Sequence, residues 1–389
     1  MPVTVSGVGE GGEPMRSSKG VRPLAALVLA AGEGTRMRST QPKPLHLLCG
    51  RPMVLHVLDA LAELPVKRVV VVVGHGAEGV TKAVQEGAPS TFALEFVEQH
   101  VQRGTGDAAA VGLTGFPDFP DDEHEDGDVV VLPGDAPLLR PPTLAALVRT
   151  HRASDAAASL LVARLEDPTG YGRLVKDKDG RIARVVEEAD ATEEERAVDE
   201  VNTSVYCFRR SVLAPALRRL SPENANGEYY LTDTVAVLHD AGYQISSLAV
   251  ADPMEVAGVN DRAQLAVAEA ELRDRTNERW MRRGVTMHDP ERTYVDASAQ
   301  LAPDVTLLPG TVLEGTTAVA TGASIGPDTR LVDCRVGEGA VVEHCVGRQA
   351  DIGADARVGP YAVLEPGCRV APGTLTGPFF RGGGDEHGG

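Results

Sequence analysis

Short apolar runs alternate with amphipathic stretches between Val21 and about Ala251. Uninterrupted apolar runs are typical of strands in a sheet that is covered on both faces. The amphipathic stretches between them have helical period, so the alternation predicts right-handed βαβ units and a Rossmann-like, mainly parallel α/β sheet. The predicted strands are 24–29, 69–73, 94–97 and 129–132, and the predicted helices are 52–64, 76–86, 104–113 and 142–151. Later strands at 159–165, 173–176 and 201–208 are expected to form a mixed extension of the sheet.

The last third of the chain follows a different period. Residues 261–283 form one charge-rich helical pattern without Gly or Pro, which predicts a solvated linker helix. Over residues 295–331 an aliphatic residue recurs at every sixth position, and after a slip near Val336 the same register is expected to resume over 346–370. A six-residue repeat of this kind predicts a parallel β-helix, in which each aliphatic anchor points inward and stacks on its equivalent one coil away.

These patterns divide the chain into five parts. The first and the last are rich in Gly and lack any period, so both are expected to be disordered tails. The three parts between them are the α/β domain, the linker helix and a short β-helix. The expected bounds are 1–20 for the first tail, 21–254 for the α/β domain, 255–290 for the linker, 291–376 for the β-helix and 377–389 for the second tail.

Composition narrows the possible partners. The 389 residues carry a formal net charge of −18, which argues against a general nucleic-acid surface, because a phosphate backbone requires a basic stripe. The longest apolar runs are too short to span a bilayer and no signal peptide is visible, so we expect a cytoplasmic protein without a membrane partner. Five scattered cysteines show no framework spacing, which favours reduced thiols.

A Gly-rich segment directly after the first predicted strand carries the candidate chemistry. Its small residues let the backbone approach a ligand, and exposed N–H groups there can hold phosphate. Arg36 offers a guanidinium fork for phosphate oxygens, and Lys43 adds a second cation. Two spaced cations in an acidic chain, at a strand end where α/β sheets bind ligands, indicate a triphosphate site. The backbone candidates are Leu29, Ala30, Ala31 and Gly32.

The segment 29–37, followed by Pro42-Lys43-Pro44-Leu45, resembles the signature of nucleotide-sugar pyrophosphorylases, and among them the bacterial N-acetylglucosamine-1-phosphate uridylyltransferases. The likeness covers nearly the whole chain, from Leu24 to about Val370. Members of this family join a nucleotidyltransferase domain to a left-handed β-helix and catalyse both uridylyl and acetyl transfer. The resemblance implies Mg²⁺-dependent uridylyl transfer from UTP to N-acetylglucosamine-1-phosphate, and a homotrimer assembled through the left-handed β-helix.

The resemblance also implies roles for residues outside this segment. Gln99 would read the edge of uracil, with the backbone of Gly104 and Thr105 packed against the base. The implied sugar contacts are Gly172, Glu187, Asn202, Tyr230, Thr232 and Asn260.

The implied magnesium ligands are Asp135, which follows Gly134 at the end of a predicted strand, and Asn260. Two protein oxygens suit Mg²⁺, because this ion keeps most of its own hydration. The residues alone leave two other interpretations open. Asp135 could be an ordinary turn aspartate, and Asn260 could be the N-cap of the linker helix.

Two departures from the family pattern affect these expectations. Val363-Leu-Glu-Pro-Gly367 stands where the acetyl-transfer half of the family has Arg-x-Arg-Pro-Gly, and the sequence ends at Gly389, before the coils that would supply the catalytic histidine. We therefore expect no acetyltransferase activity. Ser204 stands where the family usually has glycine, which leaves the choice of sugar more open than uridylyl transfer itself.

The expected mechanism is in-line attack of the sugar-1-phosphate oxygen on the α-phosphorus of UTP, with release of pyrophosphate. Such a transfer needs positioning and charge neutralisation more than a covalent nucleophile. Three alternatives remain. The same chemistry could use another sugar-1-phosphate or TTP. The chain could be a non-catalytic regulatory or scaffold paralogue. It could also be a hexapeptide acyltransferase, although His344 is the only histidine in the repeat region.

Overall fold

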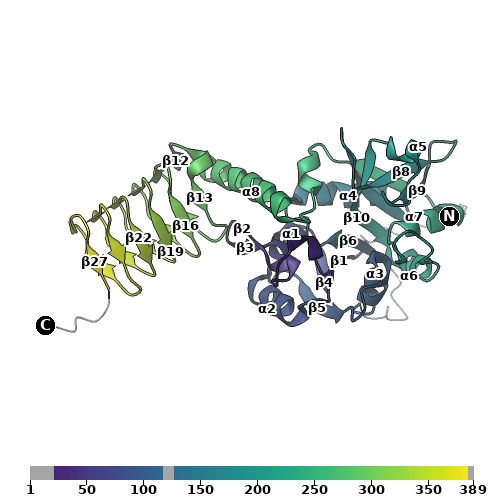
Figure 1. Cartoon of the computed structure of the whole chain (residues 1–389), viewed down its shortest axis with the longest axis horizontal. Helices are drawn as coiled ribbons and strands as arrows, with labels where there is room; N and C mark the ends of the chain where they lie inside the picture. Colours follow the sequence, from purple (N-terminus) through teal and green to yellow (C-terminus); the bar gives the residue numbers. More distant parts are fainter. Residues whose placement is uncertain (1–21, 117–126, 384–389) are drawn as a thin grey trace, which may run out of the picture.

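The computed structural model describes residues 22–116 and 127–383, so the predicted tail at 1–20 lies outside the described residues. The first two thirds of the chain are built around one large sheet (Figure 1). Its strands are β1 (Leu24–Ala30), β4 (Val66–Val73), β5 (Ala93–Glu98), β6 (Asp128–Pro133), β7 (Ala158–Arg164), β8 (Gly172–Lys176), β9 (Ile182–Val186), β10 (Glu200–Arg209) and β11 (Ile245–Ala249). Seven of them lie side by side in the order β11-β7-β10-β6-β1-β4-β5.

The strand directions confirm the predicted Rossmann-like α/β sheet. β6, β1, β4 and β5 are parallel to one another, and β11 is parallel to β7. β10 is the exception, because it runs antiparallel to both of its neighbours, β6 and β7. The carboxyl ends of β1, β4 and β6 therefore meet at one edge of the sheet, where α/β folds bind their ligands.

Helices cover both faces of this sheet because the inner strands are apolar on both faces. In β1, Ala26 and Val28 belong to the core on one face, while Leu27 belongs to the core on the other. The first face is covered by α1 (Met53–Ala62), α2 (Ala77–Gly87) and α4 (Pro141–Ala153). The second is covered by α3 (Thr105–Leu113), α6 (Arg210–Leu217) and α7 (Asp233–Asp240).

Several elements have no counterpart among the predicted ones. β9, β11, α6 and α7 are absent from the prediction, as are a small hairpin formed by β2 (Leu47–Leu48) and β3 (Arg51–Pro52) and the short α5 (Glu193–Arg196). α5 begins with a capping box, in which Thr192 and Glu195 satisfy each other's backbone N–H groups. β8 and β9 form an antiparallel arm that is attached to the sheet through β10.

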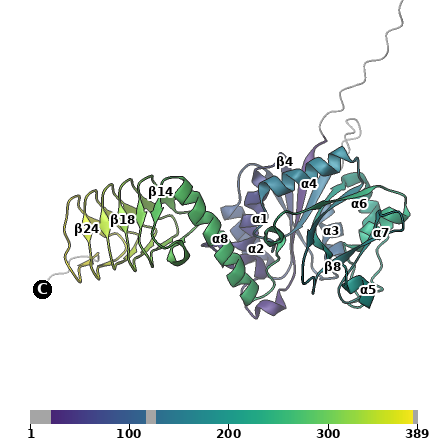
Figure 2. The ribbon, with the colours of Figure 1, turned by 90° about the horizontal axis from the view of Figure 1, so that it is seen from above.

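A long helix, α8 (Arg262–Arg282), leads from the α/β domain to the coils (Figure 2). Within the described residues, no helix is both long enough and apolar enough to cross a membrane. Short 3-10 turns lie at the sheet edge and on both sides of α8. η2 (Lys43–Leu45) lies near the sheet edge, η3 (Pro253–Val256) precedes α8 and η4 (Pro290–Arg292) follows α8.

The coils after α8 form the predicted left-handed parallel β-helix, with three narrow sheets of parallel strands. One sheet contains β12 (Thr286–Met287), β15 (Thr306–Leu307), β18 (Ser324–Ile325), β21 (Val341–Val342) and β24 (Arg357–Val358). The second contains β13 (Tyr294–Val295), β16 (Val312–Glu314), β19 (Arg330–Val332), β22 (Val346–Arg348), β25 (Val363–Leu364) and β27 (Arg381–Gly382). The third contains β14 (Gln300–Leu301), β17 (Ala318–Val319), β20 (Arg335–Val336), β23 (Asp351–Ile352) and β26 (Arg369–Val370).

The predicted register is wrong at one coil. Val346 is 43% exposed, and its neighbour Gly347 takes the inward position, paired with Leu331 and Leu364 on the adjacent coils. The interior is already full at this point, because a Cβ on Gly347 would lie 2.9 Å from Leu331 Cδ2. The slip near Val336 therefore extends one coil further than the six-residue period predicts.

The prediction of a disordered tail from residue 377 is also wrong in part. Arg381 and Gly382 form β27, which pairs with β25 and adds one more rung to the second sheet. Residues 384–389 lie outside the described residues.

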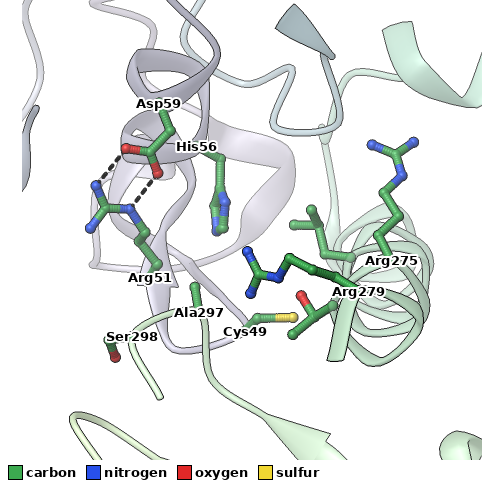
Figure 3. A pocket seen from close by; sticks show the side chains of 10 residues that line it. Cys49, Arg51, His56, Asp59, Arg275, Arg279, Ala297 and Ser298 are labelled. Atoms are coloured by element: carbon green, nitrogen blue, oxygen red, sulfur yellow. Dashed lines mark hydrogen bonds and ion pairs between the residues drawn. The ribbon is translucent and has the colours of Figure 1, made fainter. Parts of the chain in front are cut away.

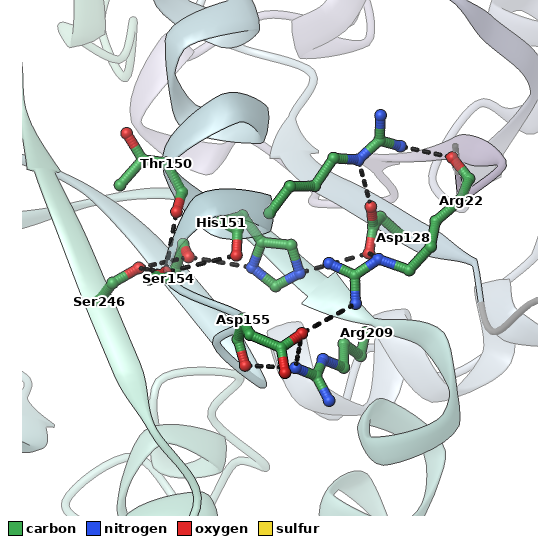
Figure 4. A network of polar contacts seen from close by, with 10 residues as sticks. Arg22, Asp128, Thr150, His151, Ser154, Asp155, Arg209 and Ser246 are labelled. Carbon is green, nitrogen blue, oxygen red and sulfur yellow. Dashed lines mark hydrogen bonds and ion pairs between the residues drawn. The ribbon is translucent and has the colours of Figure 1, made fainter. Parts of the chain in front are cut away.

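A buried polar network fixes α4 to the sheet at the end opposite the candidate site (Figure 4). His151 lies between Asp128 and Ser159, with its Nδ1 2.9 Å from Ser159 Oγ and its Nε2 3.4 Å from Asp128 Oδ1. Burial alone would raise the pKa of Asp128, but hydrogen bonds from His151 and Arg152 outweigh it and lower that pKa. The arrangement contains a serine, a histidine and an aspartate, yet all three side chains are buried, so it serves packing rather than nucleophilic catalysis.

Candidate active site

The loop after β1 closes tightly on Lys43. Gly34 has a φ of 64° and precedes a short 3-10 turn, η1 (Thr35–Met37). A Cβ on Gly34 would lie 2.6 Å from Lys43 Cβ, so this position requires glycine both for its conformation and for its space. A Cβ on Gly32, in contrast, would meet nothing within 4 Å, so the backbone there faces open space in which a ligand can lie.

Lys43 lies between two oxygens from distant parts of the chain. Its ammonium contacts Asp135 Oδ2 and donates a hydrogen bond to Asn260 Oδ1 at 3.0 Å. Arg36 Nη2 donates to the same Asn260 oxygen, also at 3.0 Å. The backbone N–H of Val259 donates to the carbonyl of Asp135 at 2.9 Å and so joins the two loops that carry these oxygens. The structure thus brings four predicted site residues to one point.

The start of α8 explains why Asn260 is available for this cluster. The Asp261 side chain accepts a hydrogen bond from the backbone N–H of Gln264 at 2.8 Å, which makes Asp261 the N-cap. The interpretation of Asn260 as the helix cap is therefore wrong, and its amide oxygen points at the two cations instead.

The oxygens of this cluster fit a divalent cation. Asp135 and Asn260 offer a carboxylate and an amide oxygen, two ligand types that Mg²⁺ accepts, and a positive group, the Lys43 ammonium, already lies between them. In residues 22–116 and 127–383 there is no group of three or more His, Cys, Asp or Glu that could hold a metal. A cation here would complete its coordination with phosphate oxygens and water, as Mg²⁺ commonly does.

Gln99 lies buried just after β5, and its side chain is oriented by a residue that the sequence did not single out. Its amide nitrogen donates to Asp107 Oδ2 at 2.7 Å and to the carbonyl of Gly104 at 3.3 Å. These contacts fix which way the amide points, so its oxygen is left as the acceptor for a ligand. Asp107, in the first turn of α3, is therefore a positioning residue.

Two glycines hold the neighbouring loops in close contact. A Cβ on Gly74, directly after β4, would lie 2.6 Å from the carbonyl oxygen of Ala31 and 2.9 Å from Gln102 Nε2. Gly104 has a φ of 103°, and a Cβ there would lie 2.6 Å from the carbonyl oxygen of Tyr229. Gly74 therefore lets the loop after β1 approach the segment around Gln99. It was missed at the sequence level, although a glycine that ends an apolar strand is a visible signal.

Thr105 connects the Gln99 segment to the predicted sugar residues. Its hydroxyl accepts a hydrogen bond from the backbone N–H of Leu231 at 3.0 Å, and Gly106 N–H donates to the Tyr229 carbonyl at 2.7 Å. These bonds place Tyr230 and Thr232 beside the start of α3.

Buried polar atoms without partners line the predicted sugar side. Asn202, in β10, donates through its Nδ2 to the Tyr206 hydroxyl at 2.8 Å, but its Oδ1 is buried and has no hydrogen-bond partner among the described residues. The Tyr230 hydroxyl is buried in the same condition. A buried oxygen without a partner is costly, so a ligand group or a water molecule that donates a hydrogen bond to it would be stabilised.

Glu187 completes this group. It follows β9, and its Oε1 accepts a hydrogen bond from the Thr232 hydroxyl at 2.9 Å, while Gly172 lies against it with its Cβ position 3.3 Å from Glu187 Oε2. Burial raises the pKa of Glu187, and the neighbouring carboxylates Asp233 and Asp190 raise it further against the hydrogen bond from Thr232. All five predicted sugar residues of the α/β domain thus gather around β8, β9 and β10.

Ser204 adopts a conformation that normally favours glycine. It has a φ of 60° and lies where the pairing of β10 with β7 shifts between Asn202 and Tyr206. Because β10 runs antiparallel to β6, the start of β10, which carries Asn202, lies at the same sheet edge as Asp135. The bulge requires a left-handed backbone at this position, which explains both the glycine that the family usually has there and the positive φ of Ser204.

Comparison with known proteins agrees with this geometry. Residues 26–237 match the family described as the MobA-like NTP transferase domain. The chain is 46% identical to the bifunctional protein GlmU of Desulfitobacterium hafniense over 355 residues, which cover 91% of this chain and 75% of that protein. It is 44% identical to the bifunctional protein GlmU of Streptomyces avermitilis over 92% of this chain and 73% of that protein.

The chain belongs to the GlmU family. It is a nucleotidyltransferase of the UDP-N-acetylglucosamine pyrophosphorylase type, and uridylyl transfer is its general chemistry. The GlmU match extends well beyond the transferase domain, since 355 aligned residues exceed the 26–237 range of that domain.

The raised pKa of Glu187 yields a stability prediction that does not depend on substrate. A carboxyl group whose pKa is raised in the folded state stabilises the fold below its unfolded-state pKa and loses that contribution as the pH rises through its folded-state pKa. Glu187→Gln removes the ionised form, and the amide oxygen can still accept from Thr232. We expect a higher melting temperature than wild type at pH 7, with the difference shrinking toward pH 4.

Glu223→Gln, at an exposed position, serves as the control and should leave the melting temperature unchanged at both pH values. A Glu187→Gln variant that is less stable than wild type at pH 7 would contradict this account of the sugar side.

Proposed function

We propose that this protein transfers uridylyl from UTP to N-acetylglucosamine-1-phosphate, giving UDP-N-acetylglucosamine and pyrophosphate. The observation that carries the proposal is the cluster of Arg36, Lys43, Asp135 and Asn260 at the sheet edge. It lies where β1 and β6 end, with the oriented amide of Gln99 near one side and the buried oxygen of Asn202 at the same edge. Base, phosphate and sugar can each meet suitable groups there.

Arg36 and Lys43 serve the phosphates in this proposal. The Arg36 guanidinium is exposed and can turn toward phosphate oxygens, while the backbone of residues 29–32 offers N–H groups beside it. Before substrate and metal bind, Lys43 is held by Asp135 and Asn260, which keeps its charge at the sheet edge where the phosphates would lie. The sugar phosphate supplies its own nucleophilic oxygen, and in-line transfer needs no covalent intermediate.

Members of the NTP transferase family generally use a divalent metal, and we propose Mg²⁺ held by Asp135 and Asn260. When bound, it would offset negative charge on the phosphates. The Lys43 ammonium lies between these two oxygens, so it would move toward the phosphates when the metal binds. The hydrogen bond from Val259 to the Asp135 carbonyl holds together the two loops that carry Asp135 and Asn260. Gly34 lets the loop after β1 close on Lys43.

Acceptor choice is assigned to the residues around Glu187. Its carboxylate and the Asn202 amide oxygen can accept from sugar hydroxyl or N-acetyl N–H groups, and the Tyr230 hydroxyl can donate. Asn260, which contacts Arg36 and Lys43, would meet the phosphate of the sugar. The proposal of N-acetylglucosamine-1-phosphate rests on these groups and on membership of the GlmU family. Another sugar-1-phosphate is the alternative, because Ser204 adds a hydroxymethyl group nearby.

The first test removes the cations one at a time. In a pyrophosphate-release assay with UTP, N-acetylglucosamine-1-phosphate and Mg²⁺, Arg36→Ala and Lys43→Ala should each lower kcat/KM by about 100-fold or more, because each removes a charge that stabilises the transition state. Arg38→Ala is the matched control, since Arg38 is an exposed arginine in the same loop, and it should stay within about twofold of wild type.

Unchanged rates in both variants would reject the proposed site. If the wild-type protein shows no activity with every sugar phosphate tested, the result would instead favour the non-catalytic paralogue.

The second test concerns the base. Without Asp107, the Gln99 amide can turn over and present its nitrogen to the ligand, which suits cytosine as well as uracil. Asp107→Ala should therefore raise the KM for UTP about tenfold and reduce the preference for UTP over CTP. Asp107→Asn keeps an acceptor oxygen and should retain most of the preference. TTP presents the same hydrogen-bonding edge as UTP, so Gln99 alone does not separate these two nucleotides.

We also propose that the β-helix assembles the protein as a homotrimer. The last coils of the β-helix carry exposed apolar side chains, among them Tyr361, which is 57% exposed, and Phe379, which is 75% exposed. The rings of these two residues stack with their centroids 5.4 Å apart. Exposed apolar groups of this size favour contact with another protein surface. Sedimentation equilibrium should give three times the mass of the chain, and a monomer at every concentration would contradict the trimer. The lack of acetyltransferase activity stays a prediction that rests on Val363 and Glu365.

A further inference from the structure

A cavity of about 410 Å³ lies where the α/β domain, α8 and the first coil meet (Figure 3). Cys49 and Arg51 contribute from the β2–β3 hairpin, His56 from α1, Arg279 from α8 and Ala297 from the coil. The hairpin and the coil touch directly here, since Ala297 N–H donates to the Cys49 carbonyl at 2.9 Å. The cavity shares no lining residue with the candidate active site.

Its arginines differ in how their charge is balanced. Arg51 forms a two-pronged ion pair with Asp59, at 2.7 and 2.8 Å. Arg275 donates to Glu271 and to the Leu138 carbonyl, both at 2.7 Å. Arg279 has neither a hydrogen bond nor an ion pair within the described residues, and its guanidinium lies over the ring of Trp280, 5.3 Å from the centroid. It is the lining arginine whose charge no carboxylate balances.

The direction of the Arg279 side chain gives this charge a location. In Figure 3 it extends from α8 toward His56 and Cys49, across the cavity rather than along the helix. Desolvation, and after it the nearby Arg283 guanidinium, lower the pKa of Arg279. The residue as a whole is exposed, so a ligand can reach its guanidinium from solvent.

The size of the cavity and the residues that line it indicate which kind of anion could balance the charge of Arg279. A guanidinium binds an oxyanion through two parallel hydrogen bonds, and phosphate suits this geometry. A volume of about 410 Å³ lies within the range of small-molecule sites and far exceeds the space of one phosphate group. Leu272 and Ala297 form an apolar part of the wall, and Thr276 provides a hydroxyl group. The cavity can therefore hold an organic group attached to the phosphate and can contact both its apolar and its polar atoms.

We propose that this cavity binds a small phosphate monoester, whose phosphate is held by Arg279 and whose organic part lies between α1, α8 and the first coil. Such a ligand would touch all three parts at their junction and so link the transferase domain to the β-helix. A purely structural role for Arg279, as a cation packed on Trp280, is the competing explanation. It differs in a measurable way, because it requires no ligand.

Isothermal titration calorimetry with glycerol 3-phosphate tests the proposal. The titrations use Arg36→Ala protein, so that phosphate binding at the candidate active site is weakened in every sample. We expect saturable binding to this parent, and binding about tenfold weaker after adding Arg279→Gln, because a charge-assisted hydrogen-bonded pair is lost. Arg283→Gln is the matched control, since Arg283 also contacts the Trp280 ring, at 5.5 Å, but does not line the cavity.

A second variant guards against misfolding. Ala297→Leu fills part of the cavity without altering its charge and should also weaken binding, while circular dichroism melts show whether each variant is folded. Inorganic phosphate forms a further arm, and we expect it to bind more weakly than the monoester because it leaves the apolar wall unused.

Each of the following results would overturn the proposal. These are no binding to the Arg36→Ala parent, equal binding by the Arg279→Gln and Arg283→Gln proteins, and weakening by Arg279→Gln but not by Ala297→Leu. Inorganic phosphate binding as tightly as glycerol 3-phosphate would show a free-anion site and reject the monoester.

Discussion

The contact of the Lys43 ammonium with Asp135 and Asn260 is the interaction on which the rest of the site depends. The two partners lie 92 and 217 positions away in the sequence, so one side chain joins the loop after β1, the end of β6 and the start of α8. Each partner is held by the backbone as well, through the hydrogen bond between Val259 and Asp135. A positive charge is therefore held at this point of the sheet edge before a substrate arrives, which favours the binding of phosphate there.

Parallel strands make this convergence possible, and glycines make it close. The edge at which β1, β4 and β6 end places three loops side by side. Gly34 and Gly74 occupy positions where any Cβ would clash with the neighbouring loop. The antiparallel β10 then brings the sugar side to the same edge, at the expense of a bulge that holds Ser204 in a left-handed conformation.

The sequence predicts those features that depend on local pattern or on a contiguous motif. Alternating apolar runs place β1, β4, β5 and β6, and the six-residue period places most of the coils. Features that arise from tertiary contacts cannot be predicted from these local patterns. Asp107 orients Gln99 across a loop, and nothing in its own neighbourhood marks it. The coil at Val346 is set by how Leu331 fills the interior, which the period does not encode.

We propose that this site transfers the uridylyl group of UTP, through its α-phosphorus, to a sugar phosphate oxygen. Incubation with UTP that carries radioactive phosphorus at the α position, N-acetylglucosamine-1-phosphate and Mg²⁺ tests it directly, with γ-labelled UTP in a parallel reaction. We expect the α label in UDP-N-acetylglucosamine and the γ label in pyrophosphate. Label from the γ position in the sugar product, or no α label in any sugar nucleotide, would contradict it.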